Sequence, residues 1–188
     1  MSNPKSPIAP FAYVALATAR QIDENSKPRF SVTQVYPEGT NLSEMKKVAG
    51  AAAAKKFPQG IPKNIRSPFR LGESKRREDG TMPEGFSPTD TFVEFWRYEK
   101  DGQVPCVDQL KNAMLPSDVY SGMTGRVAYR CSAYDYNGNK GVSFHVEAVQ
   151  KAGDGTPIGA APVNPQTEFD DLPVEGVVLE EEDINAAF

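Results

Sequence analysis

Hydrophobic and polar residues alternate along several stretches of the chain, which is the pattern of half-buried β-strands. Residues 9–22 and 28–36 are rich in β-branched and aromatic residues, and the polar stretch 23–28 separates them. This arrangement predicts a first hairpin. Residues 91–99 predict a third strand, in which Trp96 shares one face with the aromatic and acidic residues two positions away on either side.

A second hairpin is predicted near the end of the alternating region. Residues 126–136 and 140–150 flank Asn137-Gly138, a strong signal for a tight turn. Val127 and Tyr129 on the outgoing strand and Phe144 on the return strand fall on the core face. The other face of the outgoing strand carries basic and aromatic side chains together, the combination that binds single-stranded nucleic acid.

One helix is predicted between the second and third strands. Asn41 and Glu44 have the spacing of a capping box, and apolar residues then recur at helical spacing until Pro58 ends the pattern. Five strands and one helix suit a small barrel such as the OB fold, which binds oligonucleotides. We therefore expect a mainly β, OB-fold-like five-stranded barrel with one helix, although element order supports function only by analogy.

The stretch from Pro58 to Thr91 has no sustained period and carries five prolines and four glycines, so we expect a long functional or mobile loop. Residues 46–77 contain ten Lys and Arg against one acid, Glu73. Those on the helix also fit a solvated face, but the overall density points to phosphate groups. The candidate phosphate ligands in the loop are Lys63, Arg66, Arg70, Lys75, Arg76 and Arg77.

Charge divides the 188-residue chain into two parts. The formal net charge is −4, but residues 168–188 hold eight acids and no Lys or Arg. Residues 1–167 therefore carry 21 bases and 17 acids. An acidic chain can thus have a basic body that binds a polyanion. We expect a nucleic-acid-binding domain over residues 1–167 and a disordered acidic tail over residues 168–188.

Signals for catalysis, metals or membranes are weak. Cys106, Cys131 and the single His145 cannot build a four-ligand zinc site, and two buried thiols are favoured over a disulfide. No phosphate-binding glycine loop or nucleophile elbow occurs. Scattered acids fit caps and solvated groups better than metal ligands. The longest uncharged apolar stretch, 11–19, is far shorter than the roughly 20 residues of a membrane helix. We expect a cytoplasmic, non-enzymatic protein without metal or cofactor.

Several glycine-containing motifs follow one another in the second half of the chain: YSGMTGRV at 120–127, AYDYNGNKGVSF at 133–144 and VQKAGDGTPIG at 149–159. Together with PFAYVAL at 10–16 and PRFSVTQVYP at 28–37, they resemble a family of tailed-phage single-stranded DNA-binding proteins. The likeness spans roughly residues 8–172, and only 58–91 matches nothing in it. The resemblance implies an OB fold that coats single-stranded DNA during replication, recombination and repair, in the cytoplasm of the host cell.

The resemblance also implies a role for the acidic end of the chain, LEEEDINAAF at 179–188. Such a tail can occupy the basic groove when DNA is absent, and its terminal aromatic residue can dock on a replication protein such as a polymerase, helicase or primase. The residues expected to make these contacts are Glu180, Glu181, Glu182, Asp183 and Phe188. A merely solubilising end is the alternative. A monomer and a homodimer both remain open.

The resulting hypothesis is sequence-tolerant binding, in which cations neutralise phosphates and exposed aromatic rings stack on bases. Besides the loop residues, the expected phosphate ligands are Arg29, Arg97, Arg126, Arg130 and Lys140, and the expected stacking residues are Trp96, Tyr98, Tyr134 and Tyr136. Trp96 fits the core equally well. Phe11, Tyr13, Phe30, Phe95 and Phe144 are assigned to the core, and His145 receives no role. Alternatives are a protein–protein interaction module of a phage replication complex that does not bind DNA, and a small hydrolase, for which no site is found.

Overall fold

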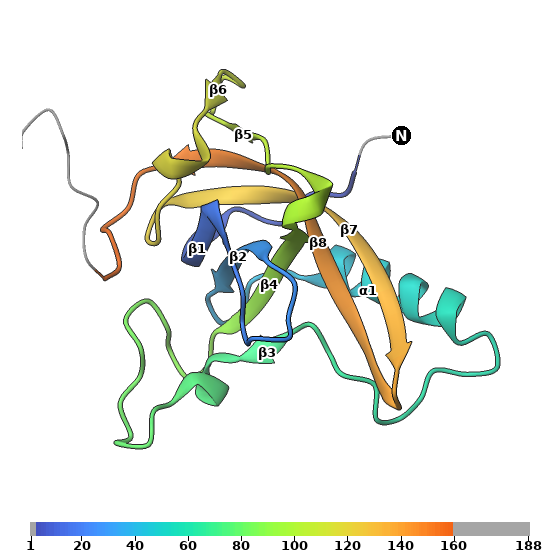
Figure 1. Cartoon of the computed structure of the whole chain (residues 1–188). Helices are drawn as coiled ribbons and strands as arrows, with labels where there is room; N and C mark the ends of the chain where they lie inside the picture. The colour runs from blue at the N-terminus through green and yellow to red at the C-terminus, as the bar shows by residue number, and fades with distance from the viewer. Residues whose placement is uncertain (1–2, 160–188) are drawn as a thin grey trace, which may run out of the picture.

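The computed structural model describes residues 3–159, and the predicted strands and helix all occur in it (Figure 1). Period-two patterning located the strands well, with boundaries shifted by at most a few residues. The long strands are β1 (Ala9–Arg20), β2 (Arg29–Tyr36), β4 (Thr91–Tyr98), β7 (Thr124–Tyr136) and β8 (Asn139–Gly153), and the helix is α1 (Ser43–Lys56). The acidic segment 168–188, with the tail contacts expected there, lies outside the described residues.

The five long strands pair in a closed ring. β2 pairs antiparallel with β1 and β4, and β7 pairs antiparallel with β1 and β8. The ring closes where β4 and β8 run parallel, with Phe95 opposite Phe144. A closed ring leaves the long strands few free edges. The prediction of a mainly β, OB-fold-like five-stranded barrel with one helix is confirmed.

Aromatic side chains fill the interior of the ring. Phe95, Tyr129 and Phe144 contact one another, with ring centroids 4.9–5.6 Å apart. The buried amide of Gln34 is also satisfied, because its Nε2 donates to the carbonyl of Gly125 at 2.8 Å. Because large apolar side chains and a fully hydrogen-bonded polar group hold this core, the outer face of the sheet is presented rigidly.

Helix α1 packs beside β7 and buries Met45, Ala49 and Ala53. The predicted capping box is wrong. The helix begins at Ser43, one residue later than that motif requires, and Asn41 Oδ1 instead accepts a hydrogen bond from the Ser43 N–H at 3.0 Å. This is a local turn before the helix, which competes with the capping geometry.

The segment predicted as one long loop contains two short elements, β3 (Arg70–Leu71) and the 3₁₀ helix η1 (Gly72–Lys75). β3 pairs with β4, and the Gly72 N–H donates to the carbonyl of Asp90 at 2.7 Å. A Cβ at Gly72 would lie 1.9 Å from the Ser87 carbonyl oxygen, so only glycine allows this close approach. The loop is therefore anchored to the barrel at residues 70–75, and the part after η1 projects away from the barrel (Figure 1).

A short hairpin extends the sheet at the opposite end of the molecule. It consists of β5 (Cys106–Val107) and β6 (Ala113–Met114), and β5 pairs with β8 (Figure 1). Two more 3₁₀ helices, η2 (Glu99–Asp101) and η3 (Pro116–Asp118), join these elements to the barrel. Cys106 and Cys131 are free thiols. Among residues 3–159, no helix has the length and apolar character to cross a membrane.

Candidate nucleic-acid interface

The outer face of the sheet carries three neighbouring aromatic side chains, two from β4 and one from β8. Alternation turns Val93 and Phe95 into the core and leaves Trp96 and Tyr98 half-buried on the outside. The Tyr98 ring packs edge-on against Trp96, with centroids 4.9 Å apart. The parallel pairing with β8 brings His145 to the other side, 4.5 Å from Trp96. The indole is thus held between two rings and stays partly accessible.

A groove of about 450 Å³ opens beside Trp96. Its lining residues come from the segment that leads into β3, from β4 and β8, and from β7. Its lining residues are Arg66, Ser67, Pro68, Arg70, Glu94, Trp96, Tyr134, Val142, Ser143 and Phe144. Four of the sequence-predicted DNA-binding residues, far apart in the chain, therefore meet in one groove: Arg66, Arg70, Trp96 and Tyr134.

Glu94 holds two guanidinium groups at this groove. Arg29 Nη2 lies 2.8 Å from Glu94 Oε1, and Arg70 Nη2 lies 4.0 Å from Glu94 Oε2. The Arg29 guanidinium carbon also lies 5.5 Å from the centre of the Trp96 ring, in cation–π geometry. One carboxylate thus orients two cations without neutralising both, and the net positive charge favours an anionic ligand.

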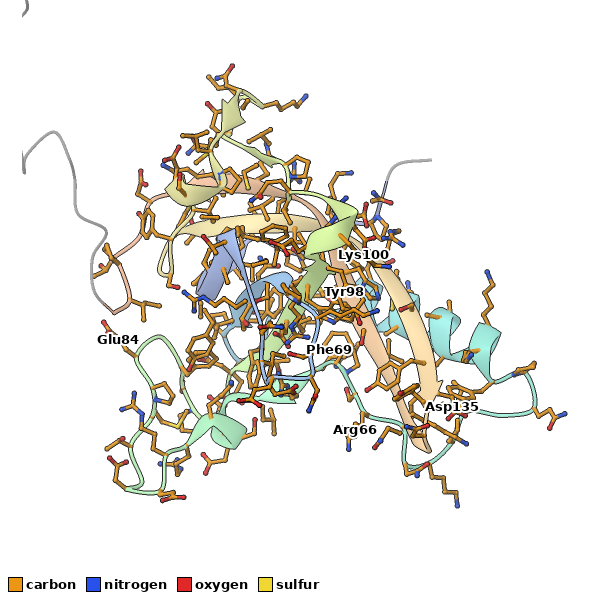
Figure 2. The ribbon with its side chains drawn as sticks, viewed as in Figure 1. Arg66, Phe69, Glu84, Tyr98, Lys100 and Asp135 are labelled. Atoms are coloured by element: carbon orange, nitrogen blue, oxygen red, sulfur yellow. The ribbon has the colours of Figure 1, made fainter. Side chains whose placement is uncertain are left out.

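Arg66 is fixed by backbone pairing with the hairpin of β7 and β8. Its N–H donates to the carbonyl of Lys140 at 2.8 Å, its carbonyl accepts from the Val142 N–H at 3.1 Å, and Nη2 contacts Asn139 Oδ1 at 3.2 Å. Figure 2 shows Arg66 and Phe69 along this segment, which runs toward the hairpin end marked by Asp135. The segment predicted to be a loop is here an additional edge of the sheet.

Tyr134 depends on Gly141, which lies directly opposite it on β8. A Cβ built at Gly141 would lie 2.3 Å from the Tyr134 hydroxyl oxygen and 2.5 Å from its ring carbon Cζ. The tyrosine ring therefore lies over the glycine, and any side chain at position 141 would displace it. Sequence reasoning did not assign Gly141 to the site, although it is the last glycine of the NGNKG motif.

His145 lies directly beside Trp96, although sequence patterns alone assign it no role. Its Nε2 lies 2.7 Å from Ser132 Oγ, and its ring packs against Trp96. Burial, and then the nearby Arg130 charge, lower the pKa of His145 below its usual value. The imidazole is therefore neutral at neutral pH and supports the indole by packing. The only signal that could have found it is its outward position on β8, opposite Arg130.

The chain matches one protein family over most of its length. A family model described as Enterobacter phage Enc34, ssDNA-binding protein, matches residues 9–181. The chain belongs to this family of phage ssDNA-binding proteins. The resemblance inferred from the motifs is thereby confirmed. A comparison with curated proteins gives no match.

Solved structures show the same fold as this phage ssDNA-binding family member. The single-stranded DNA-binding protein from bacteriophage Enc34 in complex with ssDNA is 14% identical, with a TM-score of 0.64 over 82% of this chain and 88% of that one. Another structure of the Enc34 protein is 15% identical, with a TM-score of 0.62 over 88% of this chain and 89% of that one. Gp2.5, a single-stranded DNA-binding protein encoded by bacteriophage T7, is 16% identical, with a TM-score of 0.56 over 81% of this chain and 92% of that one.

Some predicted phosphate ligands of this family member lie away from the groove. Arg97 is on the opposite face of β4 from Trp96 and donates to the carbonyl of Asp101. Arg126 donates to Gln150 Oε1 at 2.9 Å, nearer the end of β8 that pairs with β5. Arg130 forms a 2.5 Å ion pair with Glu147. Arg130 is thus paired with an acid, whereas neutral oxygen acceptors orient Arg97 and Arg126. Only strand alternation and register could have revealed these positions.

The remaining hairpin residues lie near the groove but outside its lining. Lys140 Nζ is 3.7 Å from Asp135 Oδ2 and 5.8 Å from the Phe57 ring. Tyr136 is 71% exposed next to the turn at Asn137-Gly138. Both can meet a strand that passes over the end of the hairpin, because neither is buried.

The basic residues of the anchored loop separate into different surroundings. Lys63 and Arg77 are exposed. Arg76 forms a two-pronged pair with Glu73, with both distances 2.7 Å, which lowers the Glu73 pKa. Lys75 instead lies over the rings of Tyr13 and Phe92. These basic residues, which look alike in the sequence, therefore have three different environments: solvent, an ion pair with an acid, and the faces of aromatic rings.

One residue assigned to the core is not buried there. Phe11, Phe30, Phe95 and Phe144 are buried as predicted, but Tyr13 is 49% exposed on the outer face of the barrel. A register shift in the pairing of β1 with β2 lies between Ala12 and Ala15, and Tyr13 has a φ of 48°. At this irregularity the regular alternation of β1 is interrupted, and Tyr13 is exposed rather than buried in the core.

Proposed function

We propose that this protein binds single-stranded DNA along the groove beside Trp96, coats it without strong sequence preference, and catalyses no reaction. The observation that carries the proposal is the convergence of Trp96 and Tyr134 with three cations, Arg29, Arg66 and Arg70, on one outer face. Membership of a phage ssDNA-binding family supports the same ligand.

The geometry suggests how a strand is held. Bases have π faces whatever their sequence, so stacking on Trp96 or Tyr134 tolerates any base and stabilises the complex by about 1–3 kcal/mol for each base. Arg29 and Arg70 are already oriented by Glu94 and can each donate further hydrogen bonds to phosphate oxygens. Arg29, Arg66 and Arg70 lie around one groove and can therefore contact one phosphate backbone. This arrangement favours a single strand over a duplex, which has two backbones.

The biological setting of this binding is part of the proposal. We assign residues 1–167 to the DNA-binding domain and residues 168–188 to an acidic tail that contacts a replication polymerase, helicase or primase through Glu180–Asp183 and Phe188. The protein acts in replication, recombination and repair in the cytoplasm of the host cell. Charge supports the tail assignment, because eight acids without a base complement a body that holds all 21 Lys and Arg.

Fluorescence anisotropy of a labelled single-stranded oligonucleotide tests the proposal, with duplex DNA and RNA of equal length for comparison. The wild type is expected to bind the single strand in preference to the duplex, and Trp96→Leu to weaken that binding by about 1–3 kcal/mol. Lys111→Gln serves as the control, because Lys111 lies between β5 and β6 at the opposite end of the barrel (Figure 1). Equal affinity for duplex and single strand, or unchanged binding by Trp96→Leu, would contradict the proposal.

A further inference from the structure

A further exposed aromatic residue, Tyr13, packs on Phe86, which contacts Phe92 on the same face of β4 as Trp96. Tyr13 is 49% exposed and has a φ of 48°, a left-handed backbone conformation that a bulky side chain rarely adopts. Such strained positions persist only where surrounding contacts stabilise them, and they concentrate at functional sites. The strained backbone presents the tyrosine ring to solvent on a strand whose regular alternation is broken at this point.

The ring of Tyr13 rests on a rigid support. It stacks on Phe86 with centroids 5.4 Å apart and an interplanar angle of 28°, and Phe86 packs edge-on against Phe92 at 5.6 Å. Phe86 is only 8% exposed. The neighbouring Gly85 is covered by Ile158, since a Cβ at position 85 would lie 2.4 Å from Ile158 Cδ1. The loop that carries Phe86 is therefore held by contacts with the barrel through Phe86 and with Ile158 through Gly85.

A cation lies beside this ring. Lys75 Nζ is 4.9 Å from the centre of the Tyr13 ring and 5.3 Å from that of Phe92. Lys75 is the last residue of η1, which is anchored where the Glu73 N–H donates to the Pro88 carbonyl at 3.0 Å. Burial, and then the charge of Arg70, lower the pKa of Lys75. Within residues 3–159, no carboxylate lies within ion-pair distance of Lys75.

Arg70 connects this second surface to the groove. It lines the groove beside Trp96, and its guanidinium carbon also lies 4.7 Å from the centre of the Phe92 ring, which Lys75 contacts as well. Phe92 and Trp96 are four residues apart on the same face of β4, or about 13 Å along an extended strand. Aromatic and cationic groups thus form one continuous row from Trp96 through Arg70 to Tyr13.

We propose that Tyr13 and Lys75 form a second nucleotide-binding subsite, in which Tyr13 stacks on a base and Lys75 binds a phosphate of a strand that continues from the Trp96 groove past Arg70. The proposal rests on the proposed function, because the same DNA strand occupies both subsites. A purely structural role for Tyr13, covering the small cluster of Ala12, Val35, Phe86 and Phe92, is the competing explanation.

Oligonucleotide length separates the two subsites. Single strands of about 4 and about 12 nucleotides, the lower and middle part of the range for one OB fold, are titrated at low salt against the full chain. Tyr13→Leu keeps an apolar side chain over Phe86 but removes the π face, and Tyr13→Phe keeps both. We expect Tyr13→Leu to weaken binding of the longer strand by about fivefold or more and to leave the shorter strand unaffected. Tyr13→Phe is expected to bind both strands like the wild type.

A second variant tests the cation of the subsite and leaves the Tyr13 side chain itself unchanged. Lys75→Gln is expected to weaken binding of the longer strand and to reduce the slope of log affinity against log salt by about 0.7, whereas Lys111→Gln leaves that slope unchanged. Thermal melts and circular dichroism verify that each variant is folded. Wild-type affinity for the longer strand in folded Tyr13→Leu and Lys75→Gln would overturn the subsite while leaving the groove intact. Failure of the wild type to bind either strand would overturn the proposed function and the subsite together.

Discussion

Trp96 and His145 face each other across the parallel pairing of β4 and β8, with ring centroids 4.5 Å apart and an interplanar angle of 66°. The pairing that closes the barrel therefore also positions Trp96, the proposed stacking residue. The imidazole packs one side of the indole, and Tyr98 packs another at 4.9 Å. The accessible part of Trp96 is thereby directed toward the groove that contains Arg66, Arg70 and Tyr134.

His145 makes the stability of the barrel sensitive to acid. Burial lowers its pKa below the ordinary value of 6.5, so the folded state disfavours the protonated ring. The unfolded chain binds the proton more readily, and stability present above about pH 6.5 is lost as the pH falls through the folded pKa. We expect Tm of the wild type to fall below pH 6.5 more steeply than Tm of His145→Gln, measured by thermal melts from pH 7.5 to about 5. Parallel pH profiles would contradict this account.

Gly141 is predicted to control the position of Tyr134. A methyl group at position 141 would occupy space 2.3 Å from the tyrosine hydroxyl oxygen, so Gly141→Ala should turn the ring out of the groove. We expect weaker single-strand binding, by up to about 1–3 kcal/mol, with the barrel still folded. Gly50→Ala is the matched control, because it faces open space on α1 and should stabilise the helix by about 0.5–1 kcal/mol without changing DNA affinity. Equal DNA affinity of the two variants would refute the role of Gly141.

Glu94 is predicted to limit the affinity of the groove for phosphate. Its carboxylate lies within 4.0 Å of both Arg29 and Arg70, so it competes with an incoming phosphate for their charge. Glu94→Gln should raise single-strand affinity by about 0.5–1 kcal/mol at low salt and lose that gain as salt screens the cations. Glu44→Gln on α1 removes the same charge from an exposed pair with Lys47 and should have little effect. A drop in affinity for Glu94→Gln would mean that orienting the two arginines outweighs the competition.

The acidic tail is predicted to compete with DNA for the basic body. Deletion of residues 168–188 removes eight negative charges and changes the net charge from −4 to +4. Single-strand affinity should therefore rise, most strongly at low salt where charges are least screened. Anisotropy titrations of the full and shortened chains measure the difference. Unchanged or weaker binding by the shortened chain would exclude competition.

Local patterns explain why the fold was largely predictable from sequence. Residue composition located β1, alternation supported the other four long strands, and Asn137-Gly138 located the hairpin turn. The site was only partly predictable, because its geometry depends on pairings between distant segments. Nothing near His145 in sequence reveals that it lies beside Trp96, and nothing near Arg66 reveals that it pairs with the start of β8. The assignment of Tyr13 to the core was wrong, because a register shift within β1 cannot be foreseen from the local sequence.

The most direct test of the account is the salt dependence of single-strand binding by a variant that lacks two cations of the groove. Arg66→Gln/Arg70→Gln is compared with the wild type and with Lys111→Gln by anisotropy over a range of salt concentrations. We expect weaker binding by the double variant and a slope of log affinity against log salt that is smaller by about 0.7 for each lost phosphate contact, with Lys111→Gln matching the wild type. Wild-type affinity and slope in the folded double variant would contradict binding of DNA in this groove.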